Sequence, residues 1–486
     1  MIDRTKFTAA DAVAYIWRGL HLPNQALTSL HLPNTSSPLP SSFKIDILAQ
    51  TGTASKADGD DVPRVSVVQA HALAEFFSEK LYTLNALPPP SSWGRIGGLH
   101  RTADDGYVRI HDAFPHHEHA AIRMLGLAST PATAAGVSRD EVGRAIRESW
   151  TATDLETKSH ENGAVIAALR AYDTWDGHPQ ASAVPDFPIL IHRLPSTGQK
   201  QTQTALPNLT KAADKCLRGL RVLELSRVMA APVAGRVLAA HGADVLWVTS
   251  ANLPSQPGLD RDMARGKRSI RLDFKSSAAD RATLIELIRS ADVFIQSYRP
   301  GSLSRHGFGP DDVARMNPGI VYASLSAYGR DGPWAERRGY DSLVQTVSGM
   351  SVSEAEHMGM GEPARAMPCQ ALDHASGYLL ATGIMAAVYR QLTLTTISPD
   401  GDDGAVSSGY EVEVSLAAVM KWLRSLGQYQ SPDPAASVRV EEDWFETRMS
   451  GFGELKALKH AASVEGVGVG WDVMPMPLGS GEAVWL

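Results

Sequence analysis

The chain has few cysteines and no long apolar run. Among its 486 residues only Cys216 and Cys369 are cysteines, and no Cys-x-x-Cys spacing occurs. Two isolated cysteines cannot build a disulfide framework or a cysteine-based zinc site, and they favour a reducing, intracellular compartment. No hydrophobic stretch approaches the length that spans a bilayer. The sequence therefore predicts neither a disulfide-rich secreted domain nor a membrane protein.

The chain also lacks an excess of basic residues. Its 46 Lys and Arg are outnumbered by 53 Asp and Glu, which gives a net charge of −7. A non-specific nucleic-acid binder normally shows a basic excess, so no nucleic-acid partner is expected. The hydrophobic share of 43% and the charged share of 20% are ordinary for a globular protein.

Targeting signals are not recognisable at either end. Residues 1–20 carry early acids and fit neither a signal peptide nor an acid-poor transit peptide. The C-terminal VWL is not a peroxisomal address. We expect a cytoplasmic location, with the mitochondrion and the peroxisome left open.

The first part of the chain has an irregular pattern. Residues 24–62 are rich in Ser, Pro, Thr, Gly and Asp, which predicts loops or a damaged segment. A strand is predicted over 62–68, a helix over 69–84, and a hairpin over 97–112 that turns at Asp-Asp-Gly. Helical segments and one more strand follow. The polar, breaker-rich residues 195–208 predict a linker.

The second part alternates strands with helices. Predicted strands are nearly unbroken apolar runs at 220–225, 243–248, 269–274, 291–297 and 319–326. Such runs, separated by helices, are typical of a parallel sheet that is covered on both faces. We therefore expect an α/β fold with a doubly wound parallel sheet in this part.

Two strand-then-helix units resemble each other. Residues 409–426 repeat the form of residues 62–81, and each places Val-x-Val or Val-Ser-Val before an apolar helix. Chance similarity and an internal duplication are both compatible with a match this short.

Six blocks of the second part resemble the family III CoA transferases of the CaiB/BaiF type, in the order that family has them. They are residues 217–248, 265–276, 291–309, 317–350, 369–391 and 409–420. The resemblance implies a Rossmann-like large domain and a smaller α+β domain, which here would begin at Trp93. Because the small domain follows the earlier of the two similar units, the chain is interpreted as an eroded tandem form with one active site.

This interpretation divides the chain into five parts. They are an N-terminal remnant of a large domain (1–92), a small domain (93–195), a linker (196–214), a CoA-binding large domain (215–440) and a C-terminal segment that returns to the large domain (441–486). Family members are interlocked dimers with active sites between large and small domains. A homodimer is therefore left open.

Asp373 is the candidate nucleophile. It stands in ALDHASGYLL, just ahead of an apolar run at 378–389. This position predicts a carboxylate at a helix N-terminus, where the macrodipole and backbone N–H groups stabilise an anion. An isolated Asp there is most often a helix cap. The resemblance instead implies that Asp373 attacks a thioester, forming an acyl–aspartyl anhydride and then an aspartyl–CoA thioester, with no metal.

Coenzyme A carries a pyrophosphate and a ribose phosphate, so its pocket is expected to be basic and rich in backbone donors. The residues that the resemblance implies as contacts are Val228, Met229, Ala230, Leu272, Tyr298, Arg305 and Arg338. Without that resemblance, each arginine is interpreted as a solvated surface charge. The expected partners are an acyl-CoA and a carboxylic acid.

Three departures from the family pattern concern this pocket. Thr249 and Ser250 stand where many members have a glutamate and a cofactor-contacting arginine. Met229 stands where formyl-CoA transferases have glutamine, and Ser297 replaces a frequent asparagine. CoA binding is therefore expected to be weaker or altered.

Two other functions are weighed beside acyl transfer. An acyl-CoA racemase or epimerase of this family uses a histidine and an aspartate, and the histidine would fall at Tyr340. A tyrosine is a poor general base at neutral pH, which argues for transfer. The second alternative is a catalytically inactive CoA-binding protein.

The histidines of HDAFPHHEH (111–119) are a candidate metal cluster. His116, His117 and His119 contain no i,i+4 pair and no cysteine supports them. A solvated loop of the small domain is therefore preferred to a metal site.

Overall fold

The structure, a computed structural model, describes residues 2–34, 39–54, 63–195, 206, 208–210, 213–359, 361, 363–397, 409–430 and 432–486, with the backbone alone over 394–397. Most of the predicted linker, 196–214, lies outside the described residues.

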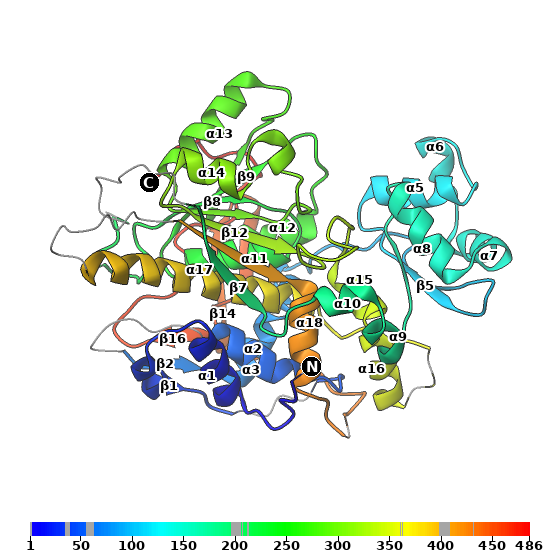
Figure 1. Ribbon diagram of the computed structural model, residues 1–486, viewed down its shortest axis with the longest axis horizontal. Helices are drawn as coiled ribbons and strands as arrows, with labels where there is room; N and C mark the ends of the chain where they lie inside the picture. The colour runs from blue at the N-terminus through cyan, green and yellow to red at the C-terminus, as the bar shows by residue number, and fades with distance from the viewer. Residues whose placement is uncertain are drawn as a thin grey trace.

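A seven-stranded sheet lies at the centre of the molecule (Figure 1). In spatial order its strands are β10 (Lys267–Arg271), β9 (Asp244–Thr249), β8 (Arg221–Leu225), β11 (Val293–Gln296), β12 (Val321–Ser326), β13 (Tyr410–Ser415) and β7 (Ile189–Arg193). The first six strands run parallel, and β7 pairs antiparallel with β13. The predicted α/β fold with a parallel sheet is confirmed.

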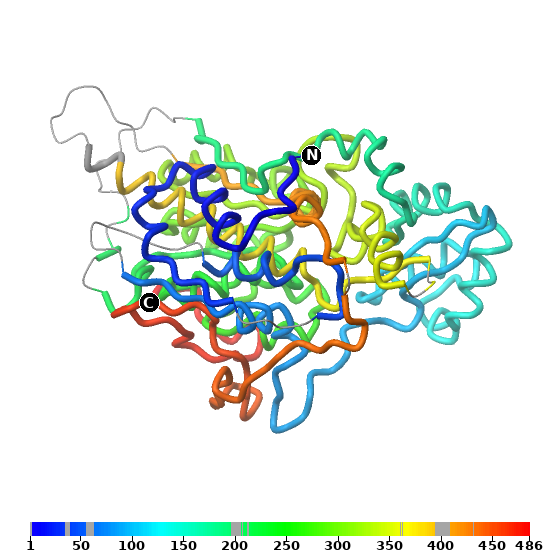
Figure 2. The backbone as a smooth tube through the Cα atoms, turned by 90° about the horizontal axis from the view of Figure 1, so that it is seen from below, coloured from blue at the N-terminus to red at the C-terminus, as the bar shows by residue number. Residues whose placement is uncertain are grey.

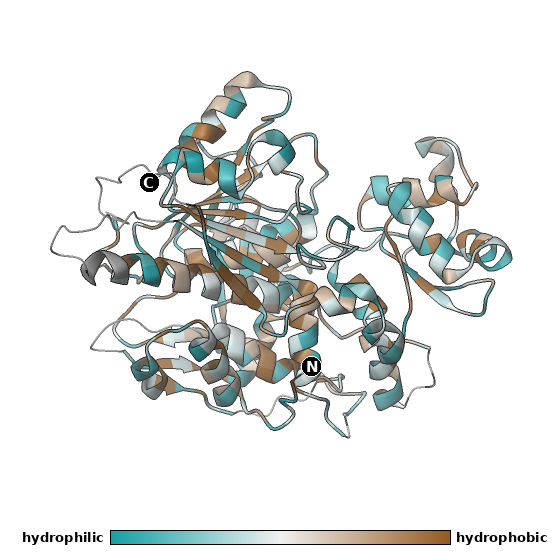
Figure 3. Cartoon of the chain, viewed as in Figure 1, coloured by the Kyte–Doolittle hydropathy of each residue, from teal (hydrophilic) through white to brown (hydrophobic). Residues whose placement is uncertain are grey.

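Both faces of this sheet are buried, which explains the unbroken apolar runs of its strands. Successive side chains of a strand point to opposite faces. In β12, Val321 and Ala323 join the larger hydrophobic cluster, whereas Tyr322 joins the cluster on the other face. Figure 3 shows apolar strands at the centre and polar helix surfaces outside.

Helices from distant parts of the sequence form the layers. On one face, α11 (Ala230–Ala240) packs against α17 (Ala371–Ile397), which also contacts β12 and β13. On the other face, the cluster that includes Phe294 and Tyr322 is closed by α13 (Ala278–Ser290) and α14 (Pro310–Met316).

The N-terminal residues add a further layer beneath α17 and are not a loop. Within 24–62 the structure contains α2 (Ile45–Thr53), whose residues are buried except for the partly exposed Asp46 and which packs on α17. The prediction of loops was wrong here. Small residues were interpreted as breakers, but Gly52 serves close packing, since a Cβ at this position would lie 2.9 Å from Cβ of Tyr378.

A three-stranded sheet in this layer joins the two ends of the chain (Figure 2). Strand β2 (Val65–Val67) pairs parallel with β1 (Leu30–His31) and antiparallel with β16 (Ala462–Val464). In the similar unit, strand β13 belongs to the central sheet and is followed by α18 (Leu416–Ser425). The two units thus share a local form but occupy different sheets.

The helix predicted over 69–84 is interrupted. It consists of α3 (Gln69–Glu75) and α4 (Ser78–Leu81), separated by Phe76 and Phe77. Both aromatic side chains are buried, so the chain changes direction to bury the two adjacent rings.

A separate body, here called the α5–α8 lobe, is formed by residues 96–168 around its own hydrophobic cluster. Its strands are β4 (Gly98–Arg101), β5 (Tyr107–Ile110) and β6 (Ile166–Ala168); its helices are α5 (Pro115–Met124), α6 (Pro131–Ala134), α7 (Arg139–Ser149) and α8 (Ala152–Glu161). The hairpin predicted over 97–112 is confirmed as β4 and β5. Strand β7, inside the predicted 93–195 domain, belongs to the central sheet instead.

The other elements connect these bodies. They are α1 (Ala9–Gly19), η1 (Asn24–Ser29), β3 (Thr83–Leu84), α9 (Tyr172–Asp176), α10 (Pro179–Ala183), α12 (Pro257–Met263), η2 (Ser304–His306), α15 (Asp341–Val347), α16 (Met350–Met358), η3 (Glu442–Trp444), β14 (Phe445–Ser450) and β15 (Gly453–Leu458). Strands β14, β15 and β3 form a small antiparallel sheet of their own.

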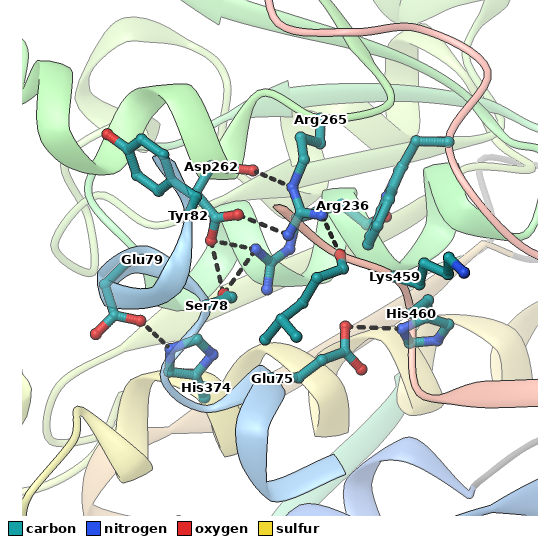
Figure 4. Close-up of polar contacts among 12 residues, drawn as sticks. Glu75, Ser78, Glu79, Tyr82, Arg236, Asp262, Arg265, His374, Lys459 and His460 are labelled. Atoms are coloured by element: carbon teal, nitrogen blue, oxygen red, sulfur yellow. Dashed lines mark hydrogen bonds and ion pairs between the residues drawn. The ribbon is translucent and has the colours of Figure 1, made fainter. Parts of the chain in front are cut away.

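Buried charges join the N-terminal layer, the central sheet's helices and the C-terminal segment (Figure 4). The carboxylate of Asp262 in α12 lies between the guanidinium groups of Arg236 and Arg265, with 2.6 Å from Arg265 Nη2 to Oδ1, and it accepts a hydrogen bond of 2.6 Å from Ser78 Oγ. Burial alone would raise the pKa of Asp262, but the two arginines outweigh it and lower the pKa to about 2. Asp262 is therefore an anion that compensates the charges of two buried arginines.

Replacing this anion should destabilise the whole fold. Asp262→Asn leaves Arg236 and Arg265 buried without a counter-charge, and such a loss costs about 3–5 kcal/mol. We expect a clearly lower midpoint in urea or thermal unfolding.

The matched control is an exposed ion pair. Glu286→Gln breaks the contact of Glu286 with Arg289, two side chains that are 69% and 57% exposed. It should change stability by less than about 1 kcal/mol. Equal unfolding midpoints for the two variants would contradict a stabilising role of the buried cluster.

Candidate active site

A cavity of about 260 Å³, here called the Asp373 pocket, lies at the carboxyl ends of the parallel strands. Open α/β sheets bind ligands at this edge, where the strand order changes direction, and here β8 separates β9 from β11. The residues that line the pocket and matter below are Phe114, His116, His117, Arg227, Val228, Met229, Ala230, Ala231, Ser297, Tyr298, Arg299, Arg338, Tyr340 and Asp373.

Asp373 lies in the first turn of α17 and is only 7% exposed. Asp341, at the start of α15, accepts hydrogen bonds from the backbone N–H groups of Leu372 (2.8 Å) and Asp373 (3.0 Å). The helix cap is therefore Asp341, not Asp373. Among the described residues none donates a hydrogen bond to the Asp373 carboxylate, which leaves both of its oxygens for a ligand.

The two neighbouring carboxyl groups hold protons more tightly than ordinary aspartates. Burial, followed by the charges of Asp341 and Glu79, raises the pKa of Asp373 well above its usual value. Burial also raises the pKa of Asp341 to about 6, although hydrogen bonds from the Asp373 N–H, Gln345 and the Leu372 N–H oppose the shift. The anionic form of Asp373 is thus poorly stabilised by the protein and correspondingly reactive.

Glycine at 377 brings Asp373 to this edge. A Cβ at Gly377 would lie 2.4 Å from the carbonyl oxygen of Ala230 and 2.5 Å from Cβ of Val233. The missing side chain therefore lets α17 pack directly on the first turn of α11.

The loop between β8 and α11 forms one wall of the pocket. Val228 has φ 71°, a left-handed conformation that is strained for a β-branched residue and that often marks a functional site. Met229 precedes the helix without a side-chain cap. Backbone N–H groups at the start of α11, where Ala230 and Ala231 line the pocket, can therefore bind an anion.

Three arginines make the pocket basic. Arg227, Arg299 and Arg338 all line it. The Arg227 guanidinium lies 4.7 Å from the ring centre of Phe114, which brings a residue of the lobe's edge into contact with the β8 loop.

A second cavity of about 440 Å³ adjoins this pocket along the ends of β9 and β10 and is here called the adjoining cavity. Both cavities are lined by Phe114, Arg227, Val228 and Tyr298. Among the other lining residues of the adjoining cavity are Trp247, Thr249, Ser250, Gln256, Asp260, Arg261, Arg271, Phe452, Pro477 and Leu478.

The predicted site residues separate into two groups. The pocket collects Asp373, Val228, Met229, Ala230, Tyr298 and Arg338. Leu272 packs in the core beneath the sheet and lines neither cavity. Arg305 is 59% exposed, lies 3.9 Å from Glu336 and also lines neither cavity.

The histidine cluster lies in a different setting from the one predicted. His116 and His117 belong to α5 and line the Asp373 pocket, and His117 is only 4% exposed. The solvated loop was therefore a wrong prediction. Within the part of the chain that the structure describes, no three His, Cys, Asp or Glu side chains are placed to hold a metal ion.

The comparisons with known proteins bear on this site. Residues 217–423 match the profile of CoA-transferase family III. The chain carries a CoA-transferase family III domain. This family III domain runs from β8 into α18 and contains Asp373, and the resemblance of the six sequence blocks is confirmed.

Relatives share part of the chain. Over 230 residues it is 34% identical to an acetyl-coenzyme A transferase of Hypoxylon pulicicidum, covering 46% of this chain and 36% of the relative. Over 242 residues it is 32% identical to a probable fatty acyl-CoA transferase of Mycobacterium tuberculosis, covering 46% and 59%. The chain thus spans between about a third and three fifths of these two relatives.

A solved structure of a CaiB/BaiF family protein from Brucella suis is similar at 26% identity and a TM-score of 0.35, covering 50% of this chain and 65% of that one.

No helix among the described residues combines the length and the apolar character needed to cross a membrane.

Removing the Asp341 carboxyl group should change how stability depends on pH. A carboxyl group with a raised pKa binds its proton more tightly in the folded chain than in the unfolded one, so it lowers stability as pH rises from its ordinary 3.8 through about 6. Asp341→Asn does not titrate. The difference in Tm, variant minus wild type, should therefore become more positive between about pH 4 and about pH 7.

Loss of the Asp341 contact with Gln345 costs the variant the same stability at every pH. The change of the Tm difference with pH therefore reports the titration of the Asp341 carboxyl group. Ser342→Ala, next along the chain and without an ionisable group, should give a constant difference. A constant difference for Asp341→Asn as well would contradict the raised pKa.

Proposed function

We propose that the protein is a CoA transferase that moves CoA from an acyl-CoA thioester to a carboxylic acid, with Asp373 as the covalent carrier. The observation that carries this proposal is the Asp373 carboxylate itself. It is buried, accepts no hydrogen bond from a described residue, and lines a pocket with three arginines. The names of the relatives, an acetyl-coenzyme A transferase and a probable fatty acyl-CoA transferase, support the same class of reaction.

The two cavities suit a long anionic thioester. The arginines of the Asp373 pocket, together with Arg261 and Arg271 in the adjoining cavity, supply cations for phosphate groups. Arg271 on β10 lies in the cavity where Thr249 and Ser250 replace the family's usual arginine, so a neighbouring strand supplies a charge there. The uncapped start of α11 adds backbone donors.

The reaction proceeds by acyl transfers between carboxylate oxygens and the sulfur of CoA. An Asp373 oxygen attacks the thioester carbonyl carbon, the carbon–sulfur bond breaks, and CoA leaves as the thiolate, which gives a mixed anhydride. The thiolate then attacks the aspartyl carbonyl carbon and releases the donor's carboxylate, which leaves an aspartyl–CoA thioester. The acceptor carboxylate attacks this thioester, and the returning thiolate takes the acceptor acyl group and frees Asp373.

The electrostatics of the pocket support this chemistry. Burial and the neighbouring acids raise the pKa of Asp373, so its anion gains stability by becoming an uncharged anhydride or thioester. A buried position also keeps water from an anhydride that water would hydrolyse.

The racemase alternative finds less support. Burial raises the pKa of Tyr340 to about 12, although Arg227 and Arg338 oppose the shift. Its ring stacks on His111 with 3.8 Å between the ring centres. A phenol with such a pKa is a poor base at neutral pH.

Asp373→Asn should abolish transfer and covalent labelling. The change keeps the size of the side chain but removes the nucleophile, so the rate should fall by at least about 1,000-fold. After incubation with an acyl-CoA, borohydride or hydroxylamine treatment should modify Asp373 in the wild type, as mass spectrometry of the peptide would show. Glu356→Gln, an exposed acid on α16, is the control and should label normally.

Two other results would replace this proposal. Solvent deuterium at Cα of the acyl group without labelling of Asp373 would indicate racemisation. CoA binding with neither event would indicate an inactive binding protein.

The arginines of the pocket should matter more than the exposed one. Arg338→Ala and Arg227→Ala should each raise KM for acyl-CoA about tenfold or more, because a charge-assisted hydrogen bond contributes about 1.5–3 kcal/mol. Arg305→Ala should change KM less than about twofold, as a surface ion pair contributes little. If Arg305→Ala weakens binding as strongly as Arg338→Ala, the ligand reaches Arg305, as the family resemblance implies, and does not end in the two cavities.

A further inference from the structure

His117 is carried to the Asp373 pocket by the lobe. Pro115 occupies the first turn of α5, a position that suits proline, and the helix buries Ala121 and Ile122 in the lobe's own core. His117 lies in the same first turn, lines the Asp373 pocket and is 4% exposed. The lobe and the family III domain therefore place His117 and Asp373, respectively, on the same 260 Å³ cavity.

The imidazole of His117 has no hydrogen-bond partner among the described residues. None of the described residues hydrogen-bonds to either ring nitrogen, and Nδ1 is fully buried. Its neighbours are rings: Phe114 at 5.6 Å, His116 at 4.1 Å and Tyr340 at 6.1 Å between ring centres. A buried donor without an acceptor costs about 1–3 kcal/mol. A ligand oxygen in the pocket would remove this cost.

The ring is neutral at physiological pH. Burial, then the charges of His116, His111, Arg338 and Arg227, lowers the pKa of His117 to about 2. A neutral imidazole carries one N–H donor and does not repel the arginines beside it. It can therefore donate a hydrogen bond to an oxygen without gaining or losing a proton.

We propose that His117 is a second catalytic residue, which donates its ring N–H to the thioester carbonyl oxygen while Asp373 attacks the carbonyl carbon. This inference rests on the proposed CoA-transferase function. In that step the C=O electron pair moves to oxygen and His117 keeps its proton. The oxygen's electron pair then re-forms the C=O bond as the C–S bond breaks, and the negative charge leaves on the thiolate. A hydrogen-bond donor that meets the charge developing on this oxygen stabilises the transition state more than the substrate.

The test compares three variants at the level of the covalent step. His117→Leu removes the donor and keeps an apolar side chain, so kcat and the rate of Asp373 labelling should both fall about 100- to 1,000-fold. KM for acyl-CoA should change less than about threefold, because the contact forms mainly in the transition state. His117→Gln restores a neutral N–H donor and should regain at least about tenfold of the lost rate. His119→Leu changes a histidine of the same helix that lines neither cavity and should keep both rates.

The measurements separate this inference from the function on which it rests. Circular dichroism and CoA binding of each variant first establish that it folds and keeps the pocket. Labelling of Asp373 in the wild type together with a wild-type labelling rate in His117→Leu would overturn the role of His117 and leave the transferase standing. A loss confined to KM, or equal losses in the Leu and Gln variants, would overturn it as well. Failure of the wild type to label Asp373 with any acyl-CoA would instead refute the proposed function.

Discussion

The buried anion of Asp262 is the interaction on which the assembled molecule depends. It compensates Arg236 of α11 and Arg265 after α12, and it accepts a hydrogen bond from Ser78 of the N-terminal layer. Arg265 in turn donates to the carbonyl oxygen of Leu458 in the C-terminal segment. Buried charges are tolerated only when they are paired and hydrogen-bonded, and each flanking segment contributes a hydrogen-bond partner to this cluster of the family III domain. The N-terminal residues are therefore a structural part of this protein, whatever their origin.

The site draws on the same arrangement. Glu79, one residue beyond Ser78, lies 3.1 Å from His374 Nε2, directly after Asp373 in α17. The negative charge of Glu79 contributes to the raised pKa of Asp373. The N-terminal layer thus fixes the start of the long helix and also sets the electrostatic surroundings of its carboxylate. Stability and reactivity are connected here through adjacent residues of one short helix, α4.

The sequence predicted the central sheet because strands buried on both faces consist of continuous apolar residues. It predicted Asp373 and the β8–α11 loop because these lie within contiguous family blocks. It did not predict α2, where small residues such as Gly52 serve close packing on α17 and resemble a loop. It also missed Arg227, Arg299 and His117 as pocket residues and Asp341 as the cap of α17, since these roles depend on contacts between segments far apart in the chain. Only the buried His117 had a signal in the sequence, the histidine cluster, and that signal was assigned to a loop.

The short helix α15 connects the lobe to the nucleophile. At one end Asp341 holds the first backbone N–H groups of α17. At the other end Thr346 accepts hydrogen bonds from Arg109 Nε of β5 (3.1 Å) and, through its carbonyl oxygen, from the N–H of Arg170 just after β6 (3.2 Å). One end of this helix therefore contacts α17 and the other end contacts the lobe. A change in the position of the lobe relative to α17 would therefore be transmitted through α15 to the capping carboxylate and to the charge beside Asp373.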